Sequence, residues 1–153
     1  MYLNDALKKS GISYVCMHHE QACAMAAEGY ARTSGKMAVI CVTSGPGGTN
    51  SVTGILGAWT DSVPLLCLSG QVKLETCMAS YPDLKLRQLG DQECDIVSIV
   101  KPITKYAEMI TSKDEVKTEL EKAIKIATEE RPGGVWLDIS LDIQSCFLTM
   151  QEY

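Results

Sequence analysis

The chain has 153 residues, of which 46% are hydrophobic and 22% charged, and its formal net charge is −5. This length and composition are typical of one globular domain and exclude a disordered or fibrous protein. Because Lys and Arg are scattered and no apolar run reaches the length of a membrane span, we expect no nucleic-acid partner and no membrane insertion.

Four short apolar runs predict strands of a parallel sheet, because strands that are buried on both faces are apolar at successive positions. These runs cover residues 14–17, 37–43, 65–69 and 135–139. The segment 101–110 could form one more strand, since its apolar positions do not settle the period.

Helical patterns lie between these runs, over residues 21–34, about 49–60, and 113–130. Gly35 ends the first of them, and the last keeps a 3.6-residue apolar period. Strands that alternate with helices indicate an α/β fold, a doubly wound parallel sheet in three layers. Residues 73–92 mix charges with turn residues and predict a long loop that includes one helical turn.

Seven cysteines, an odd number without a C-x-x-C pair, lie in part within apolar runs. This is typical of reduced, buried thiols and, with an N-terminus that lacks the plan of a signal peptide, predicts a cytoplasmic location. Cys16, His18, His19 and Cys23 cluster in the sequence, but their spacing fits no zinc pattern and we expect no metal site.

Ligands of open α/β sheets bind at the carboxyl ends of the strands, so the residues that follow each predicted strand are the candidates. Glu20 stands where the first predicted strand gives way to a helix. The helix N-terminus favours its charged form and burial favours its neutral form, so the carboxyl could share a proton with a ligand. The spacing alone favours a plainer role, a helix-capping glutamate without chemistry.

The glycine-rich turn 44–50 joins the second predicted strand to a helix. Such a turn can present backbone N–H groups to a phosphate. It lacks the lysine of a P-loop and the third glycine of the dinucleotide fingerprint. A tight turn whose glycines let strand and helix approach one another is an equal interpretation.

Several blocks of the sequence occur in an order and at a spacing that resemble one known family. They are residues 19–21, 26–32, 34–36, 43–50, 61–65, 69–72, 92–93, 101–105 and 131–139. Across almost the whole chain they resemble the N-terminal, pyrimidine-binding domain of thiamine-diphosphate enzymes of the acetolactate synthase group. The resemblance implies that fold without its first strand, with the domain over residues 1–140 and a linker to an absent middle domain over 141–153.

The same resemblance implies a role for each candidate. Glu20 would hydrogen-bond the N1′ atom of the cofactor's aminopyrimidine and so activate thiamine diphosphate for decarboxylation and carboligation of a 2-keto acid such as pyruvate. The residues beside the pyrimidine would be Gly45, Pro46, Gly47, Thr49 and Asn50. Gln71, with Gln92 and Glu93, would wall the active site, although a buried polar network that supports the loop is an equal interpretation.

Other parts of the site would lie outside this chain. In the family, the diphosphate and its magnesium are held by a C-terminal domain of another subunit, and FAD, where present, by absent domains. The resemblance therefore implies a homodimer or larger assembly, no turnover by the chain alone, and branched-chain amino-acid biosynthesis as the pathway. We expect His18 and His19 to be structural, and Tyr30, Trp59 and Trp136 to serve core or dimer packing.

Three interpretations of the chain follow. It is a fragment of an acetolactate synthase-like enzyme, or a pyrimidine-domain subunit of a split 2-keto acid decarboxylase, or a non-catalytic interaction module. Retention of Glu20 and of the Gly-Pro-Gly turn argues against the third interpretation. The absence of the family's first strand argues against the second.

Overall fold

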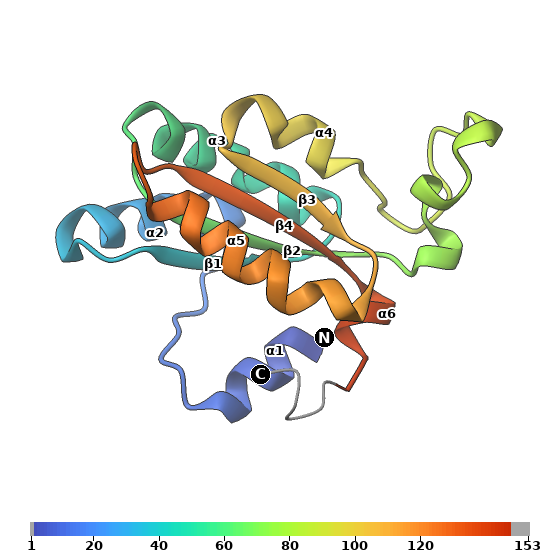
Figure 1. Cartoon of the computed structure of the whole chain (residues 1–153), viewed down its shortest axis with the longest axis horizontal. Coiled ribbons are helices and arrows are strands. Elements are labelled where there is room, and N and C mark those ends of the chain that lie inside the picture. The colour runs from blue at the N-terminus through green and yellow to red at the C-terminus, as the bar shows by residue number, and fades with distance from the viewer. Residues whose placement is uncertain (1, 148–153) are drawn as a thin grey trace.

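The computed structural model describes residues 2–147. Its centre is an all-parallel sheet with the strand order β1-β2-β4-β3. The strands are β1 (Ala38–Val42), β2 (Leu65–Gln71), β3 (Tyr106–Ile110) and β4 (Gly134–Ser140). Helices cover both faces of the sheet, so the predicted three-layer α/β fold is confirmed (Figure 1). The ambiguous segment 101–110 contains a strand, β3.

One face of the sheet is covered by α2 (Glu20–Ser34), α3 (Pro46–Thr60) and the short α4 (Ile96–Val100). Gly35 ends α2 as predicted, in the left-handed conformation with φ 69°. Helix α3 begins earlier than predicted, because the glycine-rich turn is itself helical from Pro46, a residue that suits the first helical position. A Cβ at Gly54 would lie 2.5 Å from Ala24 Cβ, so this glycine lets α3 cross α2 closely.

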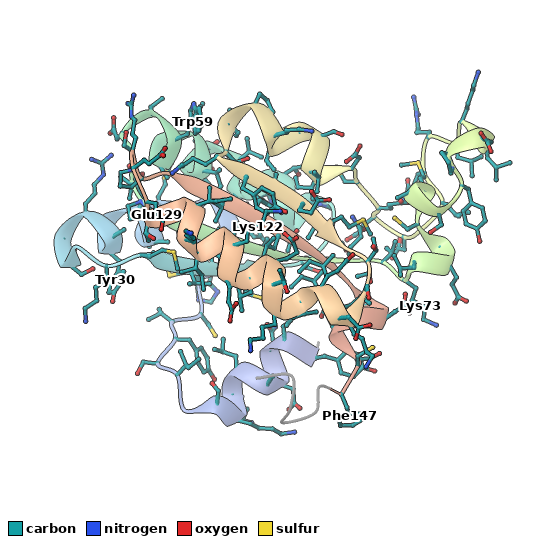
Figure 2. The ribbon with its side chains drawn as sticks, in the orientation of Figure 1. Tyr30, Trp59, Lys73, Lys122, Glu129 and Phe147 are labelled. Carbon is teal, nitrogen blue, oxygen red and sulfur yellow. The ribbon has the colours of Figure 1, made fainter. Side chains whose placement is uncertain are left out.

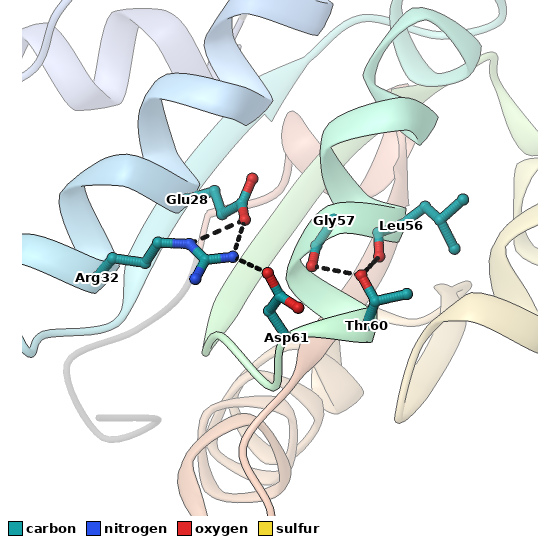
Figure 3. Close-up of polar contacts among 6 residues, drawn as sticks. All are labelled: Glu28, Arg32, Leu56, Gly57, Thr60 and Asp61. Atoms are coloured by element: carbon teal, nitrogen blue, oxygen red, sulfur yellow. Dashed lines mark hydrogen bonds and ion pairs between the residues drawn. The ribbon is translucent and has the colours of Figure 1, made fainter.

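An ion-pair cluster also joins these two helices (Figure 3). The Arg32 guanidinium on α2 binds Glu28 Oε1 one turn earlier, at 2.5 Å, and also the carboxylate of Asp61, which follows α3. Exposed ion pairs contribute little stability each, but this one spans two elements. The ion pair joins the C-terminal ends of α2 and α3, and the close contact at Gly54 joins the two helices nearer their starts.

The opposite face is covered by α5 (Val116–Thr128), α1 (Tyr2–Ser10) and the short α6 (Leu141–Gln144) (Figure 1). A single 3₁₀ turn, Lys113–Glu115, leads into α5. The helix ends before the predicted residue 130, because Glu129 is extended and Glu130 has a φ of 53° ahead of the next strand. Ile143 packs against this core, so α6 lies on the domain. Residues 148–153 of the expected linker lie outside the described residues.

The predicted strand 14–17 is wrong. These residues are irregular and exposed, Val15 to 81%, and no described segment pairs with them. A β-strand forms only where a neighbouring strand pairs with its backbone N–H and C=O groups. The apolar pattern of a segment does not show whether such a neighbouring strand exists. Within the sheet, β1 pairs with β2 and its other edge pairs with no described strand.

The segment between β2 and α4 extends away from the body at the end where β2 finishes (Figure 1). It contains three 3₁₀ turns, Leu74–Thr76, Met78–Ser80 and Pro82–Leu84, and a further such turn, Lys101–Ile103, follows α4. Apart from these turns it is the long loop that the sequence predicts. We call residues 73–95 the arm.

The seven cysteines are all free within the described residues, which confirms the expectation of unpaired thiols. Their burial was predicted wrongly in part, because Cys67 and Cys77 are buried whereas Cys16, Cys41 and Cys146 are exposed. Among residues 2–147, no helix combines the length and the apolar character that crossing a membrane requires.

The three aromatic residues assigned to packing divide into two kinds. Trp136 is fully buried in the core between the sheet and α3. Tyr30 on α2 and Trp59 on α3 are 50% and 39% exposed and lie at the surface (Figure 2). A core role therefore holds for Trp136 alone of these three.

Candidate active site

Glu20 is the first residue of α2, but it does not cap the helix. The cap is His19, whose extended backbone precedes the helix and whose Nδ1 accepts the N–H of Gln21 at 3.1 Å. Through this hydrogen bond His19 acts as a structural residue at the start of the helix. The capping role thus belongs to its neighbour, and the Glu20 carboxylate is available for other contacts.

The carboxylate of Glu20 meets the start of α3. Asn50 Nδ2 donates to Glu20 Oε2 at 3.1 Å, although the two residues are 30 positions apart. The other oxygen, Oε1, faces Gly47, where a Cβ would lie 3.8 Å from it and 2.7 Å from Thr43 Cγ2. The structure therefore brings Glu20, Gly47 and Asn50 together.

The environment of Glu20 favours its charged form. Its own backbone N–H is the largest influence that lowers the pKa, followed by the hydrogen bond from Asn50, whereas burial acts weakly in the opposite direction. The neighbouring His19 adds a further, smaller decrease. The balance between burial and helix N-terminus that the sequence left open is decided here in favour of the carboxylate.

The turn before α3 is held by its own backbone and by the arm. Gly45 precedes the helix with a φ of 55°, and a Cβ there would lie 2.0 Å from Gln92 O. The N–H groups of Gly47 and Thr49 donate to Ser44 O and Gly45 O, and Thr49 Oγ1 to Pro46 O. These donors are used within the turn, which supports the tight-turn interpretation over a phosphate cradle.

Gln71, the last residue of β2, belongs to a different network. Its Nε2 donates to Asp138 Oδ2 at 2.9 Å and to Cys94 O at 3.0 Å, and its Oε1 accepts the N–H of Val72. The side chain is 6% exposed. Its amide thus ties the sheet to the base of the arm, which is the buried network that the sequence left as one of two interpretations.

Glu93 likewise forms hydrogen bonds that tie segments together, in this case within the arm. Its two carboxylate oxygens accept the backbone N–H groups of Met78, Leu89 and Gly90 at 2.5, 3.1 and 3.0 Å. Burial raises its pKa, but the hydrogen bonds together outweigh this and hold the pKa below its ordinary value. Glu93 therefore shapes the arm.

Asp138 is a buried carboxyl that the sequence analysis did not single out. Ser69 Oγ donates to its Oδ1 at 2.5 Å, and Trp136 Nε1 donates to Ser69 Oγ at 2.8 Å. Burial raises its pKa to about 6, against the hydrogen bonds from Ser69 and Gln71, which lower it. A signal was present, because a charged residue inside an otherwise apolar strand buried on both faces needs hydrogen-bond partners.

A cavity of about 300 Å³ lies at the carboxyl ends of β1 and β2, between them and helices α1 and α6. Thr43, Ser44, Gln71 and Gln144 line it, whereas Glu20 does not. The sequence candidates thus occupy two neighbouring places, with Gln71 at this cavity and Glu20 with Asn50 across the turn. Among residues 2–147, no three His, Cys, Asp or Glu side chains are grouped in a way that could hold a metal ion.

Comparisons with known proteins agree with the fold. The family model described as "Thiamine pyrophosphate enzyme, N-terminal TPP binding domain" matches residues 1–99. Similar curated relatives include the acetolactate synthase large subunit of Haemophilus influenzae, 42% identical over 132 residues, which are 86% of this chain and 22% of the relative. The isozyme 3 large subunit of Escherichia coli is 41% identical over 140 residues, 91% of this chain and 23% of the relative.

A third relative matches almost the whole chain. The probable acetolactate synthase large subunit of Methanocaldococcus jannaschii is 39% identical over 149 residues, 97% of this chain and 24% of the relative. The chain therefore spans about a quarter of the length of the relatives that it matches. The chain belongs to the thiamine pyrophosphate enzymes as an N-terminal TPP-binding domain, homologous to acetolactate synthase large subunits.

Proposed function

We propose that this chain supplies the pyrimidine-binding half of a thiamine-diphosphate enzyme of the acetolactate synthase kind, and that Glu20 is its catalytic residue. The observation that carries the proposal is the Glu20 carboxylate, held through Oε2 by Asn50 while Oε1 faces Gly47. No other described side chain donates a hydrogen bond to Glu20, and its own backbone N–H is the other donor. We place the ligand on the side of the carboxylate that faces Gly47.

The residues fit the cofactor's pyrimidine ring in their chemistry. A ring nitrogen that gains or loses a proton needs a partner that can accept a hydrogen bond and also titrate, and a carboxylate does both. The groups that lower the pKa of Glu20 keep it charged and ready to accept an N–H. Gly47 lets the turn approach without a side chain in the way, and Gly45, Pro46 and Thr49 fix the shape of that turn.

When bound, thiamine diphosphate supplies the electron sink for decarboxylating a 2-keto acid. Within the chain, Glu20 holds or releases a proton at one oxygen, and Asn50 holds the other. Gln71 acts indirectly in this proposal. Its amide hydrogen-bonds Asp138, Cys94 and Val72, and in this way it positions the arm beside the turn.

The wider assembly is part of the proposal. We infer that a C-terminal domain of another subunit binds the diphosphate and Mg²⁺, that FAD, if used, binds outside this chain, and that the assembly is at least a homodimer. The acetolactate synthase names of the relatives support pyruvate or a similar 2-keto acid as substrate and branched-chain amino-acid biosynthesis as the pathway. Seven unpaired cysteines support a cytoplasmic, reducing setting.

A domain exchange tests the role of Glu20. This chain would replace the matching 140 residues of the Escherichia coli isozyme 3 large subunit, and exchange of the cofactor's C2 proton for deuterium would be followed by NMR. We expect Glu20→Gln to slow this exchange at least 100-fold, within the range attributed to general acid–base groups. Glu108→Gln, a change at an exposed position of β3, is the matched control.

The outcome also separates the alternatives. Rapid exchange in the chimaera that is lost with Glu20→Gln supports a catalytic pyrimidine domain. A folded chimaera whose exchange does not depend on Glu20 would favour a non-catalytic interaction module and contradict the proposal.

A further inference from the structure

Glu20 has one polar side-chain partner in the described chain, and that partner comes from another helix. The donor is Asn50, in the second turn of α3, and its Nδ2 lies 3.1 Å from Glu20 Oε2. The orientation of the amide follows from the chemistry, since a carboxylate only accepts and the NH₂ end must face it. Asn50 is exposed, so packing does not require an amide at this position.

Two further contacts hold α2 and α3 together on the same side of the sheet. Gly54, one turn beyond Asn50, packs against Ala24 so closely that a Cβ would lie 2.9 Å from the Ala24 carbonyl carbon. At the far ends of the same two helices, Arg32 ties α2 to Asp61 (Figure 3). Glu20 and Asn50 both stand on these packed helices, so the Asn50 amide is presented to Glu20 from a helix rather than from a loop.

The hydrogen bond also divides the two oxygens of the carboxylate. Oε2 is engaged by Asn50, whereas Oε1 lies in ordinary contact range of a Cβ built at Gly47. The bond to Asn50 opposes rotation of the carboxylate away from this orientation. One oxygen is therefore kept toward Asn50 and the other toward Gly47.

We propose that Asn50 is a positioning residue for Glu20: its amide holds Oε2, so that Oε1 is the oxygen presented to the pyrimidine ring. This inference rests on the proposed function of Glu20 and changes the role that the sequence resemblance implies for Asn50. The side chain acts on the catalytic carboxylate rather than on the cofactor.

Few other groups could set the charge of Glu20. The neighbours are His19, the residue that caps α2 and favours the carboxylate, and Cys23 of α2, whose pKa rises through burial and, to a lesser extent, the charge of Glu20. The facing turns of α3, residues 46–53, contain no ionisable side chain. Loss of the Asn50 amide should therefore raise the pKa of Glu20 and reduce its preference for the charged state.

The test uses the 153-residue chain with ¹³C-labelled glutamate, and follows the Glu20 carboxyl carbon by NMR during a pH titration. The titration midpoint of Glu20 should move to higher pH in Asn50→Ala, and further in Asn50→Asp, whose carboxylate repels Glu20 and cannot donate. Thr53→Ala, an exposed change one turn further along α3, should leave the midpoint unchanged. Asn50→Ser, whose hydroxyl can still donate, should restore part of the effect.

Circular dichroism confirms that each variant is folded, and Asn50→Ser supplies the comparison if Asn50→Asp does not fold. A Glu20 midpoint that is the same in the wild-type chain, Asn50→Ala and Asn50→Ser overturns the inference. Failure of the proposed function is a separate result, because it would appear as cofactor exchange that does not depend on Glu20 while the titration still responds to Asn50.

Discussion

Two carboxyl groups of this domain lie in opposite environments. Glu20 is partly exposed, accepts one side-chain hydrogen bond and has a pKa below its ordinary value. Asp138 is 1% exposed, accepts from Ser69 and Gln71, and has its pKa raised to about 6 by burial. The first is only partly buried, and the second is enclosed within the domain. The contrast supports a structural role for Asp138 and fits the proposal that Glu20 meets a ligand.

The largest expected effect on stability follows from removing the enclosed carboxyl. Asp138→Ala leaves Ser69 Oγ and the Gln71 amide without their buried acceptor, and we expect it to lower the free energy of unfolding by about 3 kcal/mol. Glu20→Ala should cost less than about 1 kcal/mol, because the residue is only partly buried and accepts one side-chain hydrogen bond. Urea unfolding at pH 5 compares the two variants, and equal losses would contradict the division of roles.

We expect the titration of Asp138 to change the stability of the domain with pH. Because its pKa is higher in the folded chain than the ordinary 3.8, the folded state binds the proton more tightly, and stability falls as pH rises through about 6. Between pH 4.5 and 6.5 we expect a decrease of about 2 kcal/mol.

Glu20 and Glu93, whose pKa values are lowered, act at lower pH and in the opposite direction, since the stability that they provide is lost as pH falls below about 4.5. Urea unfolding across this range in the wild-type chain and in Asp138→Asn isolates the buried group. A slope that persists unchanged in Asp138→Asn would assign it to other residues.

A smaller effect is expected on the open side, at Gly47. A Cβ there meets Thr43 Cγ2 at 2.7 Å but Glu20 Oε1 only at 3.8 Å, so the cost of Gly47→Ala arises from the threonine methyl group. We expect a loss of about 2 kcal/mol in thermal or urea unfolding. The double variant with Thr43→Ser, which lacks that methyl, should recover most of it, and failure to recover would show that the clash lies elsewhere.

The smallest effect concerns the cap of α2. His19→Ala removes the acceptor for the Gln21 N–H and should lower the free energy of unfolding by about 1 kcal/mol. His19→Asn introduces a good capping residue and should keep most of the wild-type stability. If His19→Ala and His19→Asn unfold at the same urea concentration, the side chain does not stabilise the helix start.

Most strands and helices of the three layers could be predicted from the sequence, because buried elements have apolar residues at regular positions. Strands β1, β2 and β4 and helices α2 and α5 lie close to their predicted ranges. The strand predicted at residues 14–17 was wrong, since its apolar residues say nothing of a hydrogen-bonding neighbour. The early start of α3 was missed for a related reason, because glycines usually indicate a turn and here the turn is already helical.

The sequence predicted which residues belong to the candidate site, but it did not predict which of their side chains are in contact. The sequence places Glu20 and Asn50 near the same edge of the sheet, yet only the crossing of α2 and α3 brings their side chains to 3.1 Å. The sequence also left the direction of Gln71 open, and the structure turns its amide toward Asp138. The roles of these residues toward a cofactor stay predictions, because they depend on groups outside this chain.

Deuterium exchange at the cofactor's C2 position, in the chimaeric large subunit, tests the contrast between the two carboxyls most directly. Glu20→Gln and Asp138→Asn would be compared at pH 7, with each rate expressed per folded molecule. We expect at least a 100-fold loss for Glu20→Gln and a change within a few-fold for Asp138→Asn. Equal losses in both variants, or no loss in Glu20→Gln, would contradict the assignment of Glu20 as the catalytic carboxylate.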